Sequence, residues 1–324
     1  MSARRHPGKI IDNTTLIDFG LYGIAGAGAV YLIQDEMTCL IDSGTRTEAP
    51  RLVKTLRKLK AFPPDIIILT HAHYDHAQGI PILREEAAKE KKGFDVLASP
   101  KTIPLLADKN YNKDFDRGPY ASIKDVVPIK DGDRLNIGEI NLRVYDLPGH
   151  ASDQIGILDE KNGNLFVADA VGNKISDGLF LPPFMPPAWD PDDFLYTIDK
   201  LKQMDYNSLS LGHFGYIYGD EAREILDETL SNTQKWWGIF EENEDKLDNN
   251  QYMLEIIKRE IEPVIPQIRV LSKKNRILLG LMNNGRKLIR KDPIDLGDMV
   301  LGNVIEQLAV GYRVYKDRLM EKSS

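Results

Sequence analysis

The chain has 324 residues, of which 42% are hydrophobic and 28% are charged, and its formal net charge is −7. This composition is typical of a globular protein with one large domain or two smaller ones. The negative charge disfavours nucleic acid as a partner, and no apolar run is long enough to span a membrane. The single cysteine excludes an intrachain disulfide, and the N-terminus lacks the apolar stretch of a secretory signal, so we expect a cytoplasmic protein.

The first two thirds of the chain alternate between strand-like and helix-like patterns. Apolar side chains recur every three or four residues in the helix candidates, whereas the strand candidates are short apolar runs between turn residues. In chain order we expect strands within 15–45, a helix over 48–60, a strand over 65–70, a helix over about 80–92, a strand over 95–99, strands within 126–170, a helix over 190–204 and a strand over 208–213. Such alternation is typical of sheets covered by helices.

From residue 220 onward the pattern is helical only, and the end of the chain is basic while the rest is acidic. We therefore expect an N-terminal domain of residues 1–219 and a helical C-terminal domain of residues 220–324. The C-terminal helices could bind substrate, form a lid or make a homodimer interface, and the sequence leaves these alternatives open.

Half of the six histidines lie in one short stretch, LTHAHYDHAQG, which spans 69–79. This stretch begins where the expected strand over 65–70 ends. A loop after a strand can aim alternate side chains to one side, so His71 and His73 could share one metal. Asp75 and His76 would then serve a second metal. A surface loop that happens to hold three histidines is the alternative interpretation.

Residues further along the chain favour the metal site. His150 and His213 each follow a strand-like run and stand next to a glycine, and Asp169 stands at the end of the run NLFVAD. Strand ends at one edge of a layered sheet are where binding sites gather. Imidazole and carboxylate ligands suit zinc, iron and manganese alike, so the donor types do not select the metal.

Several segments in order resemble the motifs of the metallo-β-lactamase superfamily. HAHYDH resembles the HxHxDH signature, PGHASDQIG resembles PGHTxGS, and LIDSG, VADAV and GHFG resemble the remaining motifs. The resemblance covers about residues 15–215. It implies an α/β fold, a four-layer αββα sandwich, here followed by the α-helical extension. It also implies a dinuclear centre of two divalent metal ions, with zinc expected and iron or manganese as alternatives.

The resemblance assigns a role to each ligand candidate. The first metal would be held by His71, His73 and His150, the second by Asp75, His76 and His213, and both by the bridging residue Asp169. Asp75 would also be catalytic, because it would orient a metal-bridging hydroxide and pass its proton to the leaving group. The residues expected to support the ligands are Asp42, Thr70 and Ser152, although Asp42 could equally be a turn or cap residue.

The pair Asp75-His76 resembles the glyoxalase II and lactonase branches of the superfamily. The resemblance therefore implies a metal-dependent hydrolase that cleaves a small activated acyl substrate, namely a thioester, a lactone or an ester. One alternative is a mononuclear iron oxidoreductase similar to the persulfide dioxygenases, which share the positions of His71, His73, His150 and Asp169. Another is a regulatory protein that retains the metal site.

The substrate-binding residues are less well specified by the motifs. The proline-rich segment over 176–189 is expected to form an apolar wall of the pocket, with Phe184 and Trp189 lining it. Packing of this segment onto the C-terminal helices is the alternative. Tyr74 and Tyr216 stand next to ligand candidates and could donate hydrogen bonds to a substrate oxygen, but tyrosines are also ordinary packing residues.

Overall fold

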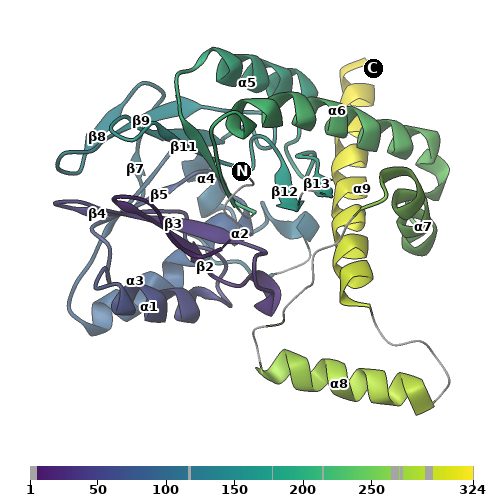
Figure 1. The fold of residues 1–324 in the computed structure, drawn as a ribbon, viewed down its shortest axis with the longest axis horizontal. Coiled ribbons are helices and arrows are strands. Elements are labelled where there is room, and N and C mark those ends of the chain that lie inside the picture. Colours follow the sequence, from purple (N-terminus) through teal and green to yellow (C-terminus); the bar gives the residue numbers. More distant parts are fainter. Residues whose placement is uncertain are drawn as a thin grey trace.

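The computed structural model describes residues 6–115, 118–176, 178–213, 215–263, 270, 273–288 and 295–323. Two β-sheets face each other, and helices cover the outer face of each sheet (Figure 1). The chain therefore forms an αββα sandwich with additional helices at its C-terminal end, as the sequence predicted.

The first sheet comes from the N-terminal part of the chain. Its strands, in spatial order, are β1 (Gly8–Ile11), β2 (Thr14–Asp18), β3 (Ala29–Gln34), β4 (Thr38–Ile41), β5 (Ile66–Leu69), β6 (Asp95–Ala98) and β7 (Val127–Pro128). The strands β1 to β4 are antiparallel, and β4 to β7 run parallel. The carboxyl ends of the parallel strands therefore share one edge of the sheet.

The second sheet is built from later strands. In spatial order they are β15 (Gly215–Tyr218), β14 (Ser208–Leu211), β11 (Asn164–Ala168), β10 (Ile155–Asp159), β9 (Asn141–Asp146) and β8 (Arg134–Asn136). Only the neighbours β11 and β14 are parallel. β12 (Asn173–Ser176) and β13 (Leu179–Leu181) form a separate hairpin, whose second strand lies inside the segment expected to be a proline-rich wall. Neither this hairpin nor β15 was predicted.

The helices confirm the main predictions from periodicity. The described helices are α1 (Ala49–Lys58), α2 (Tyr74–Ala77), α3 (Ile80–Lys89), α4 (Thr102–Ala107), α5 (Pro191–Gln203), α6 (Glu221–Glu242), α7 (Asn250–Ile261), α8 (Lys273–Leu288) and α9 (Leu296–Ser323), with short 3₁₀ turns at Leu21–Gly23, Lys113–Phe115 and Glu244–Lys246. α5 begins as its sequence indicates, because the Asp190 side chain accepts hydrogen bonds from the Asp192 and Asp193 amides. The short helices α2 and α4 were not predicted.

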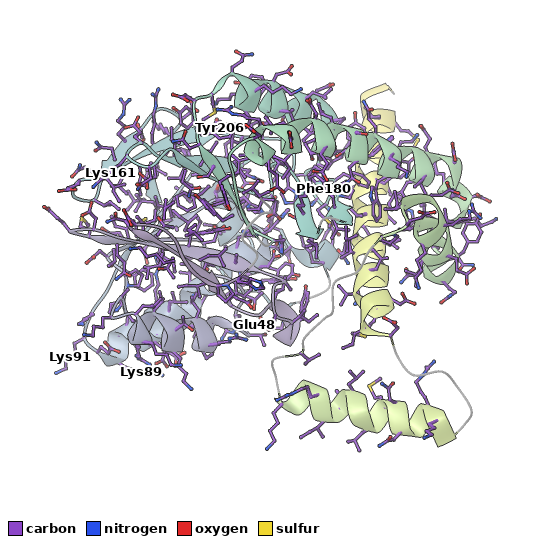
Figure 2. All side chains as sticks on the ribbon, viewed as in Figure 1. Glu48, Lys89, Lys91, Lys161, Phe180 and Tyr206 are labelled. Carbon is purple, nitrogen blue, oxygen red and sulfur yellow. The ribbon has the colours of Figure 1, made fainter. Side chains whose placement is uncertain are left out.

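Alternation along the strands places the apolar side chains in three layers. Cys39 and Ile41 of β4 join the cluster between the two sheets, whereas Leu40 faces the helices α1 and α3. Figure 2 shows the side chains that fill the space between the ribbons. Because Cys39 is fully buried there, burial raises the pKa of its thiol and the residue behaves as a packing residue.

The helices α6 and α9 share an apolar cluster with the second sheet and with α5. Trp236 and Tyr312 from these helices pack in the same cluster as Leu165 of β11 and Ile198 of α5. This packing crosses the expected boundary between residues 219 and 220, and the division into two domains stays a prediction. Within the described part of the chain, no helix combines the length and the apolar character needed to cross a membrane.

Candidate metal centre

The predicted ligands meet at one edge of the sandwich. They lie in the loop and short helix after β5 (His71, His73, Asp75 and His76), in the loop before β10 (His150), directly after β11 (Asp169) and in the turn after β14 (His213). The sequence predicted this convergence because each residue stands at the end of a strand-like run.

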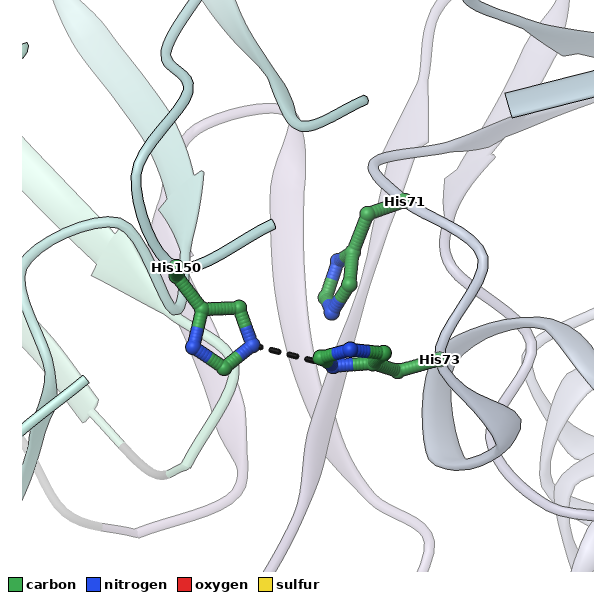
Figure 3. A group of neighbouring side chains, drawn as sticks. All are labelled: His71, His73 and His150. Atoms are coloured by element: carbon green, nitrogen blue, oxygen red, sulfur yellow. Dashed lines mark hydrogen bonds between the residues drawn. The ribbon is translucent and has the colours of Figure 1, made fainter. Parts of the chain in front are cut away.

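Three histidines form what we call the first ligand group: His71, His73 and His150. Each offers one nitrogen, and these atoms all lie within 4.8 Å of one another. Figure 3 shows the three rings converging from two loops, and the His150 Nε2 atom lies 3.0 Å from His73 Nδ1. All three side chains are buried.

A second ligand group consists of Asp75, His76 and His213, whose ligand atoms again lie within 4.8 Å of one another. His213 Nε2 is 3.2 Å from Asp75 Oδ2. This group is more exposed to solvent than the first, because 12% of the Asp75 side chain and 13% of the His213 side chain are exposed.

Asp169 connects the two ligand groups. Its Oδ2 atom lies 3.3 Å from His213 Nε2, 3.5 Å from His76 Nε2 and 3.7 Å from His150 Nε2. A single carboxylate is therefore in reach of ring nitrogens from both groups, as expected of a residue that bridges two metals.

Buried polar atoms without partners indicate that this cluster suits cations. Within the part of the chain that the structure describes, His71 Nε2, His76 Nε2 and Asp169 Oδ1 are buried and accept or donate no hydrogen bond. Leaving such an atom unsatisfied costs about 1–3 kcal/mol, and a bound cation would remove that cost. Nitrogen and carboxylate donors at this spacing fit divalent transition metals.

The first ligand group is electrically neutral. Burial lowers the pKa of His71 and of His73 well below the usual value, and neighbouring imidazoles act in the same direction. Burial also lowers the pKa of His150. These rings are therefore unprotonated at neutral pH, which is the form that binds a metal.

Carboxylates dominate the second ligand group. Burial lowers the pKa of His76 and of His213, but Asp169 and the other nearby carboxylates outweigh it and hold both pKa values well above the usual range. Burial likewise raises the pKa of Asp75, yet His76 and His213 outweigh it and bring it to about 2. The ionised carboxylates concentrate negative charge where a cation would sit.

Asp42 and Thr70 lie in the contacts predicted for supporting residues. Asp42 Oδ2 accepts a hydrogen bond from His76 Nδ1 at 2.8 Å, and Asp42 Oδ1 accepts one from the Thr70 amide at 2.8 Å. The Thr70 hydroxyl lies 3.0 Å from His71 Nδ1. A carboxylate on Nδ1 fixes the imidazole ring with Nε2 free for a metal.

Two backbone carbonyls support ligands that sequence reasoning left without a partner. His150 Nδ1 donates to the Pro183 carbonyl at 2.7 Å, and His213 Nδ1 donates to the Ala27 carbonyl at 2.8 Å. A carbonyl group carries no residue signature, so no motif could have identified these acceptors.

Ser152, the third predicted supporting residue, is exposed, which disfavours a role in supporting the buried ligands. Asp153 is buried, and its Oδ2 atom accepts a hydrogen bond from the Ala72 amide at 2.9 Å. The sequence analysis did not identify Asp153, because the resemblance assigns roles only to the histidine and the serine of this segment.

The predicted substrate residues lie in different surroundings. Phe184 is fully buried, with its ring 5.4 Å from that of Trp237 and 5.6 Å from that of Phe240. Trp189 is buried beside it, 6.0 Å away between ring centroids. Phe184 packs against α6, and Trp189 packs against Phe184 and against Phe194 of α5, so the structure favours the packing alternative over the pocket wall.

The two predicted tyrosines also differ. Tyr216 lies in β15 and belongs to the cluster between the sheets, which favours a packing role. Tyr74 lies beside the first ligand group, because Phe115 packs against both His73 and Tyr74 at 5.0 and 5.2 Å between centroids. The hydroxyls of Tyr74 and Tyr22 are hydrogen-bonded to each other.

A four-layer sandwich with a histidine and aspartate cluster at one edge is the metallo-β-lactamase type of fold. The model of the Metallo-beta-lactamase superfamily matches residues 23–213. The chain therefore belongs to the metallo-β-lactamase superfamily.

Its curated relatives are similar at low identity. The chain is 30% identical over 176 residues to a hydroxyacylglutathione hydrolase of Bradyrhizobium sp. (strain ORS 278), covering 51% of this chain and 58% of that protein. It is 25% identical over 204 residues to a hydroxyacylglutathione hydrolase of Hahella chejuensis, covering 62% of this chain and 63% of that protein. The chain thus spans less than two thirds of the length of these relatives.

Solved structures show the same fold. A metallo-β-lactamase superfamily protein from the archaeon Sulfolobus tokodaii is 19% identical with a TM-score of 0.54, covering 68% of this chain and 86% of that chain. A subclass B3 metallo-β-lactamase of Bradyrhizobium japonicum is 21% identical, also with a TM-score of 0.54, covering 71% and 92%. At these identities the likeness concerns the fold alone.

Proposed function

We propose that this chain is a metal-dependent hydrolase of a small activated acyl compound, such as a thioester, a lactone or an ester. The observation that carries the proposal is the position of Asp169, which joins two complete ligand groups into one centre. The relatives named hydroxyacylglutathione hydrolase support hydrolysis as the reaction and favour a thioester among these substrates.

Each ligand group would hold one divalent cation, with Asp169 shared between them. Such cations act as Lewis acids, which polarise an acyl carbonyl and lower the pKa of a water molecule. Zinc is the first candidate, and iron and manganese suit the same donors. No serine or cysteine nucleophile is needed for this chemistry.

The chain's own residues define how a substrate would approach. The second ligand group is the more exposed one, so an acyl compound would reach the centre past Asp75 and His213. Asp75 is ionised at neutral pH and can accept a hydrogen bond from an attacking water. It can therefore orient that water and carry its proton toward the leaving group.

Tyr74 would contact the substrate at the same place. It directly precedes Asp75, and its ring packs against Phe115, which in turn packs against His73. This aromatic packing keeps water from the first ligand group, while the Tyr74 hydroxyl could donate a hydrogen bond to a substrate oxygen.

The test measures metal content per chain in the wild-type protein and in the Asp75→Ala and His213→Ala variants, followed by hydrolysis of a panel of thioesters, lactones and esters. We expect about two metals in the wild type, fewer in either variant, and hydrolysis that the variants lose. His6→Ala, which changes the one histidine outside the centre, serves as the matched control and should behave like the wild type.

Other outcomes would overturn the proposal in distinct ways. One iron per chain that His213→Ala leaves in place would indicate a mononuclear oxidoreductase. A folded chain that takes up no metal would indicate a regulatory protein. Two metals without hydrolysis of any activated acyl compound would contradict the substrate class while leaving the centre intact.

A further inference from the structure

Side chains from two distant segments hold the peptide groups on either side of a ligand histidine. Ala72 lies between His71 and His73, and its amide donates to Asp153 Oδ2 at 2.9 Å. Its carbonyl accepts a hydrogen bond from Asn112 Nδ2 at 3.0 Å. Both polar groups of this one residue are therefore bound by side chains rather than by neighbouring backbone.

Asn112 makes a second contact on the far side of His73. Its Oδ1 atom accepts a hydrogen bond from the Tyr74 amide at 3.1 Å. Asn112 is 3% exposed and lies just before the turn at Lys113–Phe115, well separated in sequence from the histidine loop. One buried amide thus connects the residues that precede and follow His73.

His73 needs this support because no side chain in the described part of the chain fixes its ring in the way that Asp42 fixes the ring of His76. Asp42 fixes the His76 ring through Nδ1. On the His73 ring, Nδ1 faces His150 Nε2 at 3.0 Å, and the other nitrogen, Nε2, has no hydrogen-bond partner among the described residues. The direction of the His73 side chain must therefore come from its backbone and from the ring packing of Phe115.

Asp153 is a buried carboxylate, and burying a carboxylate is energetically costly. It is 1% exposed, and among the described residues its Oδ1 atom has no hydrogen-bond partner. A buried carboxylate of this kind lowers stability, so its contact with the Ala72 amide must offset that cost. The segment that carries Asp153 also carries His150, which links the two loops of the first ligand group.

We propose that Asp153 and Asn112 are positioning residues that hold the loop of His71 and His73 in the orientation required to bind the first metal. The inference rests on the proposed metal-dependent function, which it deepens by naming the groups that prepare the first ligand group. Neither side chain contacts the ligand atoms, so both act through the backbone of the histidine loop.

The test uses zinc alone as the probe and measures its affinity by chelator competition in the full-length chain. Asp153→Ala and Asn112→Ala should bind zinc at the first ligand group about 10–100-fold more weakly than the wild type. Asp153→Asn keeps an acceptor for the Ala72 amide and should restore affinity to within a few-fold. Asn112→Asp keeps the acceptor for the Tyr74 amide but loses the donor, so an intermediate affinity is expected.

Asn164→Ala is the matched control. Asn164 is a fully buried asparagine that bonds to Ser208 and Ser210 at the opposite end of β11 from Asp169. It should lower the melting temperature without changing zinc affinity. If Asp153→Ala and Asn112→Ala lower the melting temperature in the same way and bind zinc like the wild type, the positioning role is wrong. If they fail to fold, the affinity of Asn112→Asp decides, because an intermediate affinity supports the positioning role and wild-type affinity contradicts it.

Failure of the positioning role is distinguishable from failure of the proposed function. A wild-type chain that binds no zinc would contradict the function itself. Wild-type binding that all four variants retain would contradict only the positioning role. Where the variants bind weakly, saturating zinc should restore much of their hydrolysis, because the substrate contacts are unchanged.

Discussion

The two ligand groups of this centre differ in exposure and in charge. The first group is fully buried and consists of imidazoles that burial keeps neutral. The second group is partly exposed and lies among ionised carboxylates. If the proposed function is right, this difference divides the tasks, so that the first group would anchor a metal and the second would face the substrate.

The groups also differ in how they are supported. His76 in the second group is fixed by the Asp42 carboxylate on its ring nitrogen. In the first group, His150 depends on the Pro183 carbonyl, and His73 depends on contacts to the backbone of its loop. His213 of the second group also depends on a distant carbonyl, that of Ala27, so the feature that distinguishes the first group is the support of His73 through the backbone of its loop.

The largest effect is expected for Asp169→Ala, because this carboxylate belongs to both groups. Its loss should weaken metal binding by more than about 100-fold and abolish hydrolysis. Metal content after dialysis against a weak chelator measures the effect. Asp159→Ala removes another buried aspartate, one that caps the turn after β10, and should leave metal content unchanged. Wild-type metal content in Asp169→Ala would exclude a bridging role.

Phe184→Ala separates packing from substrate binding. Removing this fully buried ring should destabilise the chain by about 3–5 kcal/mol, measured by denaturant unfolding. Because the neighbouring Pro183 carbonyl binds His150, the first group should also lose affinity for its metal. Leu195→Ala, at an exposed position on α5, is the control. Unchanged stability with a raised KM would instead place Phe184 in the pocket wall.

Gly212→Ala tests the second group by crowding it. A Cβ atom at this position would lie 2.4 Å from Asp169 Oδ1 and 2.8 Å from His76 Cε1, so these ligands must shift. We expect about a 10–100-fold loss of affinity for the second metal, because both shifted residues would bind it, and a smaller loss for the first metal, which would share only Asp169. Gly238→Ala in α6 meets no atom within 4 Å and should bind both metals normally. Equal loss of both metals would show that the groups are not independent.

Much of this architecture could be predicted from the sequence. The strand before His71 and the helices over 48–60 and 190–204 follow from apolar periodicity and from turn chemistry, which are local signals. The convergence of His150, Asp169 and His213 could be predicted because strand ends of a layered fold share an edge.

The features that could not be predicted from the sequence depend on contacts between distant segments. The Ala27 and Pro183 carbonyls carry no side-chain signature, and Asn112 comes from a segment with no motif. The proline-rich segment was predicted to form a pocket wall because it follows shortly after Asp169. Its actual surroundings depend on α6 and α9, whose positions no local pattern specifies.

The smallest effect concerns the pH dependence of stability at the border of the first group. Burial raises the pKa of Asp153 to about 6 from its usual 3.8, so the folded chain favours the protonated carboxyl. The contribution of Asp153 to the stability of the wild type should therefore fall as pH rises from about 4 to 6, because the folded state then carries a buried charge. Asp153→Asn cannot ionise, so relative to the wild type it should gain on the order of 2 kcal/mol across this window and nothing further above pH 7. Denaturant unfolding of the metal-free proteins at several pH values measures the difference, with Asp159→Asn as the control. A difference between Asp153→Asn and the wild type that stays constant with pH would mean that the Asp153 carboxyl titrates normally in the folded chain.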